Sequence, residues 1–166
     1  MAEMIRVKVF DFINKDQNYG KQFSRDDVED YLNDSKVKLQ LKNGKFNSLL
    51  THRSRLTSKD IVGNELYSQI APEDAPLVNR DIAGIVKSIF IKNNDTLADI
   101  LILDNDCGRF VSSLIAAGVK LSVSISFLDS SDRNSNYYEI YHIQGIDLTW
   151  SPAFLGSDVV GVLNEK

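Results

Sequence analysis

Hydrophobic and polar positions follow two different periods across residues 108–128. In the first ten residues, Phe110, Leu114 and Ala117 recur at the three-to-four-residue spacing of one helix face. Gly118 follows, and glycine adopts the left-handed conformation of a helix C-terminus without steric cost. After it the period becomes two, with aliphatic side chains on one face and mostly small hydroxyls on the other. The pattern predicts a short helix, a glycine stop and a strand that presents serines.

The same patterns predict the other elements of the chain. Alternation over residues 4–12 predicts a first strand, and Ser24 before two acidic residues predicts the start of a helix that ends near Leu32. Residues 36–41 alternate and are expected to form a short strand. Further predicted elements are a helix near 58–70, a hairpin of residues 77–92 and 96–103 that turns at 93–95, and a long final strand over 137–149.

The predicted strands, with their short antiparallel connections, favour an α+β domain in which helices flank a barrel or sandwich. We expect one domain over residues 1–166, because this length suffices for a single sizeable core. Net charge is −4 and no basic block occurs, which argues against nucleic-acid binding as the main function. The single cysteine, Cys107, excludes an internal disulfide framework and suits a reducing compartment.

Other classes of site are also disfavoured by the sequence. No stretch approaches the roughly twenty apolar residues of a membrane-spanning helix, and the N-terminus lacks the pattern of a signal peptide. The chain has two histidines and one cysteine, without the paired spacing of a zinc site. A structural zinc site is therefore excluded, and the sequence has no Walker-type loop. We expect no metal and no organic cofactor.

Several segments carry a resemblance to a known family. The run Ala-Gly-Val-Lys-Leu-Ser-Val-Ser, which ends at Ser124, resembles the nucleophile region of the prohead (capsid-maturation) proteases of tailed bacteriophages. Residues 13–32, 50–52, 77–86 and 146–153 are similar to further segments of that family, in the same order. The resemblance implies a mostly antiparallel β-barrel flanked by a few helices, related to the fold of the herpesvirus assemblins.

The resemblance also implies a set of catalytic residues. It places the nucleophile at Ser124 and the catalytic histidine at His52, and it matches Asp147 to the third member of the triad. A serine hydroxyl is a weak nucleophile unless a base removes its proton, and an imidazole that titrates near neutrality can do so. The third group would orient the imidazole and stabilise its protonated form.

His142 is the rival for the third position, because the assemblins use a second histidine. It lies five residues before Asp147, so a regular strand would point the two side chains to opposite faces. Both could serve only if a bulge intervened. The choice between Asp147 and His142 stays open at this point.

The sequence also departs from the family. Ser126 replaces a glycine that follows the nucleophile, and Ser48, Leu49 and Arg53 replace the residues around the histidine. If that glycine lets a backbone N–H approach the reacting carbonyl, a side chain at Ser126 would weaken the oxyanion hole. A catalytically inactive, protease-like structural or scaffold component of the phage head is therefore the alternative function.

The resemblance implies a serine endopeptidase that cleaves scaffold or core proteins and the major capsid protein during prohead maturation. We expect it in the host bacterial cytoplasm, inside the assembling prohead or in the virion, as a homo-oligomer without nucleic-acid or membrane partners. A scaffold-targeting tail, common in the family, is not expected because the chain stops at Lys166.

Overall fold

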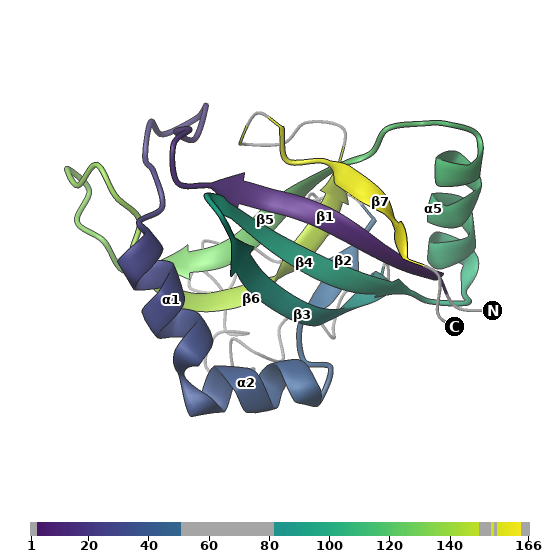
Figure 1. Ribbon diagram of the computed structural model, residues 1–166, viewed down its shortest axis with the longest axis horizontal. Helices are drawn as coiled ribbons and strands as arrows, with labels where there is room; N and C mark the ends of the chain where they lie inside the picture. The colour runs from purple at the N-terminus through teal and green to yellow at the C-terminus, as the bar shows by residue number, and fades with distance from the viewer. Residues whose placement is uncertain (1–2, 51–81, 150–153, 155, 164–166) are drawn as a thin grey trace, which may run out of the picture.

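The structure is a computed structural model that describes residues 3–50, 82–149, 154 and 156–163. Within these ranges, seven strands form one curled sheet in the order β5-β6-β2-β3-β4-β1-β7, accompanied by three helices (Figure 1). The strands are β1 (Glu3–Asp11), β2 (Asn47–Leu49), β3 (Ile82–Lys92), β4 (Asp95–Ile102), β5 (Ser122–Asp129), β6 (Ile140–Thr149) and β7 (Val159–Leu163). The helices are α1 (Arg25–Asn33), α2 (Ser35–Lys42) and α5 (Asp106–Ala116).

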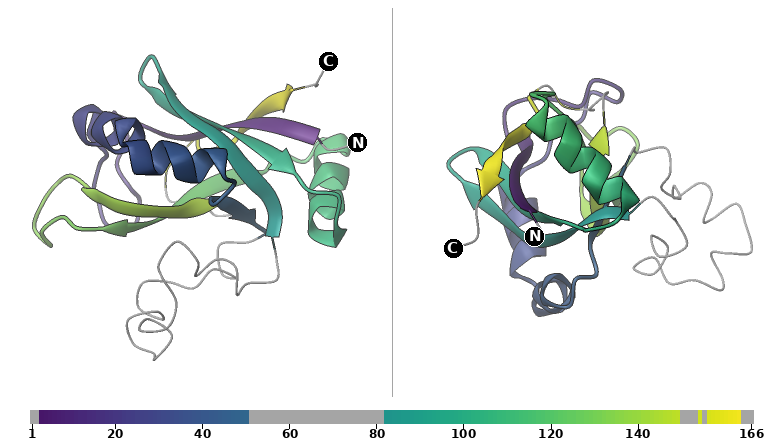
Figure 2. Two further views of the ribbon diagram at one scale, coloured as in Figure 1. Left: turned by 90° about the horizontal axis from the view of Figure 1, so that it is seen from below. Right: turned by 90° about the vertical axis from the view of Figure 1, so that its right-hand side faces the viewer.

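The sheet is mixed and forms a half-barrel, whereas the expectation was a mostly antiparallel barrel. Strands β2 and β6 run parallel, with Asn47 opposite Gly145, whereas the other neighbouring strands are antiparallel. No hairpin connects β2 to β6, so the chain is free to bring them together in the same direction. The sheet curls into a half-barrel (Figure 2), and its edges approach where the Val123 N–H donates to the Ser157 carbonyl oxygen at 2.7 Å.

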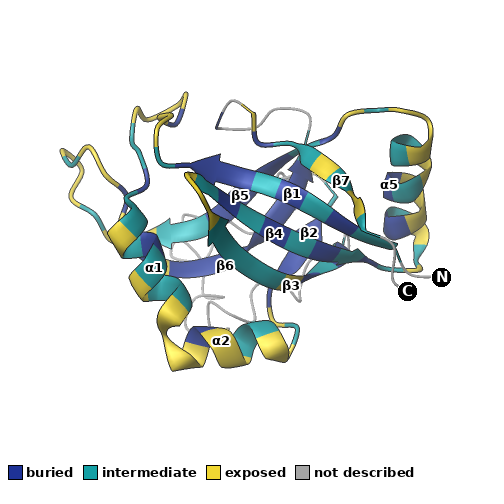
Figure 3. Cartoon of the chain, in the orientation of Figure 1, coloured by how far each residue is buried: buried dark blue, intermediate teal, exposed yellow. Residues whose placement is uncertain are grey.

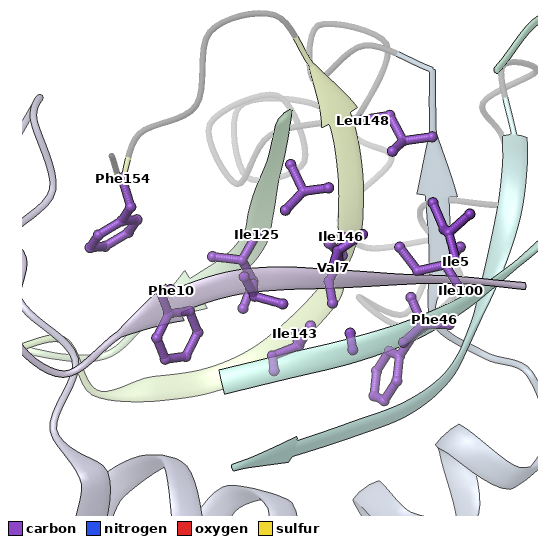
Figure 4. Packing of buried hydrophobic residues seen from close by; sticks show 14 of the residues in the cluster. Ile5, Val7, Phe10, Phe46, Ile100, Ile125, Ile143, Ile146, Leu148 and Phe154 are labelled. Carbon is purple, nitrogen blue, oxygen red and sulfur yellow. The ribbon is translucent and has the colours of Figure 1, made fainter. Parts of the chain in front are cut away.

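The concave side of the curled sheet holds the hydrophobic core. Side chains from opposite parts of the sheet meet there, and Figure 4 shows Val7 of β1 lying toward Ile125 of β5 and Ile146 of β6. The rings of Phe10 and Phe23 stack at a centroid separation of 3.9 Å. Because β5 and β6 contribute their aliphatic side chains to this core, their polar residues lie on the other face.

The first helix is confirmed and the strand predicted over residues 36–41 is wrong. The hydroxyl of Ser24 accepts a hydrogen bond from the Asp27 N–H and begins α1 as expected. Residues 36–41 instead belong to α2, because the Asp34 carboxylate accepts the N–H groups of Lys36 and Val37 and caps a second helix. The alternating aliphatics do not form a buried face, since Leu39 is 56% exposed and α2 is mostly exposed or half-buried in Figure 3.

The hairpin and the glycine stop are confirmed where the structure describes them. Strands β3 and β4 turn at Asn93, whose φ is +57°. Helix α5 ends before Gly118, which has a φ of +84°, and lies across one end of the half-barrel (Figure 2). Strand β6 is not the last, because β7 follows and pairs with β1. The helix expected near 58–70 falls outside the described residues.

Asp11 organises the loop that follows β1. Its carboxylate accepts hydrogen bonds from the N–H groups of Ile13 and Asn14, the Asn14 side chain and the Lys8 ammonium, at 2.7–2.9 Å. Burial alone would raise the pKa of this carboxyl, but the four donors outweigh it and lower the pKa from 3.8 to about 2. The ionised carboxylate therefore stabilises the folded chain.

We predict that this stabilisation disappears in acid. It is complete above the ordinary pKa of 3.8 and is lost as the pH falls toward the folded-state pKa of about 2, because the unfolded chain binds the proton first. Asp11→Asn should lower the free energy of unfolding by about 2 kcal/mol at pH 7 and by much less at pH 2.5, as measured by urea unfolding. Asp104→Asn, at an exposed carboxylate, is the control. Equal losses for both variants would contradict the role of Asp11.

Candidate active site

The pairing of β5 with β6 brings two of the predicted site residues together. Ser124 lies directly opposite Asp147 in the antiparallel register, and the adjacent pair is Ile125 opposite Ile146. The two isoleucines lie in the core (Figure 4), so Ser124 and Asp147 share the other face of the sheet. Directly opposed residues have Cβ atoms about 4.5–5.5 Å apart. The structure thus places a hydroxyl beside a carboxylate.

Asp147 also connects β6 to β2. Its Oδ1 accepts a hydrogen bond from the backbone N–H of Leu49 at 3.1 Å, and the residue is fully buried. Leu50 forms a parallel bridge with Leu148, so the end of β2 runs alongside the Asp147 segment of β6. Ser48, which departs from the family pattern as Leu49 does, is also fully buried on β2. The carboxylate therefore holds the strand that leads toward residue 52.

Ser124 is almost entirely buried, with 7% of its surface exposed. His52 and Arg53 lie outside the described residues, and the described part of β2 and its bridge ends at Leu50. The structure therefore brings Ser124 and Asp147 together. The contact of His52 with these two residues stays a prediction.

His142 lies farther along β6. The strand carries an extra residue, because Ser126 is opposite Gly145 whereas Phe127 is opposite Ile143. Because of this bulge, the side chains of His142 and Asp147 can lie on the same face of the sheet although the two residues are five positions apart. The register nevertheless separates His142 from Ser124, because His142 is opposite Leu128, four residues or about 13 Å along β5 from Ser124.

A second polar pair lies beside Ser124 and was not recognised from the sequence. The Ser126 hydroxyl donates a hydrogen bond to Oε1 of Gln144 at 2.8 Å. Ser126 is 8% exposed and Gln144 is 2% exposed. Gly145 inside a predicted strand was the available signal, because a glycine in that position often marks a bulge.

The described ranges contain no group of three His, Cys, Asp or Glu residues that could hold a metal ion. None of the helices in those ranges is long and apolar enough to cross a membrane.

Comparisons with known proteins bear on the fold. No protein-family model matches the chain, and no curated protein matches its sequence. Among solved structures, the chain is similar to the bacteriophage T4 capsid assembly protease gp21, with a TM-score of 0.51 and 17% sequence identity. The similarity covers 94% of this chain and 80% of that protein. The chain therefore has a fold like that of a phage capsid assembly protease.

We predict that the Asp147 carboxylate contributes to stability through the Leu49 N–H. Asp147→Ala leaves this buried donor without its acceptor and should lower the free energy of unfolding by about 1–3 kcal/mol. Asp147→Asn keeps a side-chain oxygen at the same place and should cost less. Chemical denaturation of the two variants measures the difference. An alanine variant as stable as the asparagine variant would show that the hydrogen bond does not hold β2.

Proposed function

We propose that this protein is a serine endopeptidase of the phage prohead, with Ser124 as nucleophile, His52 as general base and Asp147 as the group that orients His52. The observation that carries the proposal is the Ser124–Asp147 pair on one face of β5 and β6, in a fold like that of a capsid assembly protease. A hydroxyl and a buried carboxylate on adjacent strands supply two of the three groups that such chemistry needs.

Chain connectivity supports His52 as the third group. Leu50 is bridged to Leu148, next to Asp147, and His52 follows only two residues later. Two residues span at most about 7 Å. Chain length alone therefore allows the contact between His52 and Asp147 that the proposal requires.

The same geometry favours Asp147 over His142 as the orienting group. One imidazole must contact the nucleophile through one ring nitrogen and its orienting partner through the other, so these two groups must lie within about 8 Å of each other, the ring plus two hydrogen bonds. Asp147 is directly opposite Ser124, whereas His142 is about 13 Å away along the strand. We assign His142 no part in the reaction.

The proposed reaction proceeds through an acyl-enzyme. Ser124 Oγ attacks the carbonyl carbon of the scissile peptide bond while His52 takes the hydroxyl proton. The C–N bond then breaks, and His52 gives the proton to the leaving amine. Water next attacks the ester carbonyl, with His52 again as base, which releases the new carboxyl terminus and restores Ser124. The Asp147 carboxylate stabilises the imidazolium in both steps.

The fold suggests the setting of this reaction. A protein with the fold of a capsid assembly protease would act inside the assembling phage head, on scaffold or core proteins and on the major capsid protein. Its confinement there would favour self-association. These partners are part of the proposal.

One observation favours the alternative function, a catalytically inactive structural component of the phage head. The Ser126 side chain lies on the Ser124 face, hydrogen-bonded to Gln144, where the family has a glycine. The experiment on Ser124 distinguishes an enzyme from such a component.

We predict that a fluorophosphonate probe, which phosphonylates activated serines, labels the protein at Ser124. Intact mass should rise by one adduct, and peptide mapping should place the adduct on β5. Ser124→Ala should abolish both the labelling and the cleavage of the cognate scaffold protein. His52→Ala should slow labelling by at least about a hundredfold, because general-base catalysis contributes roughly 10²–10⁴.

Ser122→Ala is the matched control, since Ser122 lies two residues away on the same strand and donates to Asp158 at 2.7 Å. It should be labelled like the unmodified protein. If the unmodified protein is neither labelled nor able to cleave the scaffold, the protease proposal is wrong and the structural alternative stands.

A further inference from the structure

The outward face of α1 is acidic. Acidic side chains recur there at the three-to-four-residue spacing of one helix face, on the side away from the buried Val28: Asp26, Glu29 and Asp30. Asp26 and Asp30 are exposed, and Glu29 pairs with Arg25 of the same helix across 3.8 Å. This face therefore presents mainly negative charge to the surroundings.

The outward face of α2 is basic and has an apolar centre. Val37 faces the protein, whereas Leu39 is 56% exposed. Exposed lysines of the same helix flank this leucine: Lys36, Lys38 and Lys42. In the part of the chain that the structure describes, no acidic side chain forms an ion pair with these lysines. The chain as a whole carries a net charge of −4, so this face differs from the rest in the sign of its charge.

The two faces are neighbours and have similar lengths. Asp34 alone separates the helices, so the acidic helix ends where the basic helix begins. Figure 1 shows α1 and α2 meeting at a corner of the molecule, and Figure 3 shows exposed residues along both. Their nine and eight residues each extend about 12–14 Å. A second copy, related by a two-fold axis near this corner, would present its acidic helix to α2 and its basic helix to α1.

We propose that α1 and α2 form a docking surface for a second copy of this chain, in a two-fold dimer in which α2 of each copy lies against α1 of the other. The acidic side chains of α1 supply the partners that the lysines of α2 lack within the described part of the chain. Each contact occurs twice in such a symmetric interface. An exposed ion pair contributes little by itself, so association depends on the sum of these pairs and weakens as salt screens them. The dimer does not depend on the role of Ser124 and goes beyond the proposed chemistry.

Paired charge reversals test the inference by sedimentation equilibrium. Lys36→Glu/Lys38→Glu reverses the charge of α2, and Glu29→Lys/Asp30→Lys reverses that of α1. The new acids lie at the start of a helix and the new bases in the second half of one, where the helix dipole favours them. Each variant alone should dimerise at least about tenfold more weakly than the unmodified protein, because like charges face each other. An equimolar mixture should form a heterodimer with an affinity within about threefold of the unmodified dimer, because both contacts are complementary again.

Lys15→Glu/Arg133→Glu is the matched control. It makes the same change of charge on two loops outside the helices and should dimerise like the unmodified protein. Raising NaCl from about 50 to about 500 mM should weaken dimerisation of the unmodified protein at least about tenfold, a measurement that needs no variant. Sedimentation is measured without the fluorophosphonate probe, so failure of the proposed enzyme activity leaves this test unaffected.

Four results would overturn the inference. The unmodified protein could stay monomeric at low salt and millimolar concentration, which would leave the basic face to an acidic protein other than this one. Reversal variants that are folded by circular dichroism could dimerise like the unmodified protein, which would place the interface elsewhere. A mixture of the two folded variants could remain monomeric. Finally, dimerisation could be insensitive to salt, and this measurement decides the outcome if a variant does not fold.

Discussion

The register of β5 against β6 is the constraint on which the candidate site depends. Ile125 and Ile146 are opposed and buried in the core, and this burial fixes which residues face outward. A slip of β5 by one residue would turn Ser124 into the core and Ile125 onto the polar face. The hydrophobic core thus sets the position of the hydroxyl and the carboxylate, although neither belongs to it.

Strand β2 runs parallel to β6 and adds a third strand to the site. The Leu49 N–H donates to Asp147, and the Leu50–Leu148 bridge continues the pairing to the point where the chain runs on toward residue 52. The same carboxylate therefore has a structural contact and, in the proposed reaction, an electrostatic role. Asp147→Ala affects both, whereas Asp147→Asn affects mainly the second, which is why the two variants are informative together.

The sequence predicted correctly those helix ends and turns that depend on one or a few neighbouring residues. Ser24 begins α1, Asn93 turns the β3–β4 hairpin, and Gly118 follows α5, as the sequence indicated. The strand expected over residues 36–41 failed because the cap at Asp34 outweighs a short alternating pattern that buries little. Three features were not predicted: the parallel pairing of β2, the strand β7 and the bulge at Gln144. They depend on contacts between distant segments of the chain, which the local spacing of hydrophobic residues does not predict. The candidate site residues came from a family resemblance. The fold similarity to a phage capsid assembly protease supports the general fold that this resemblance implied.

The distance between His52 Nε2 and Ser124 Oγ in a crystal structure tests the central claim most directly. The account predicts hydrogen-bond distance, about 2.6–3.2 Å, with the other imidazole nitrogen facing the Asp147 carboxylate. An imidazole on another surface of the protein, far from both groups, would contradict the account and leave a structural role in the phage head.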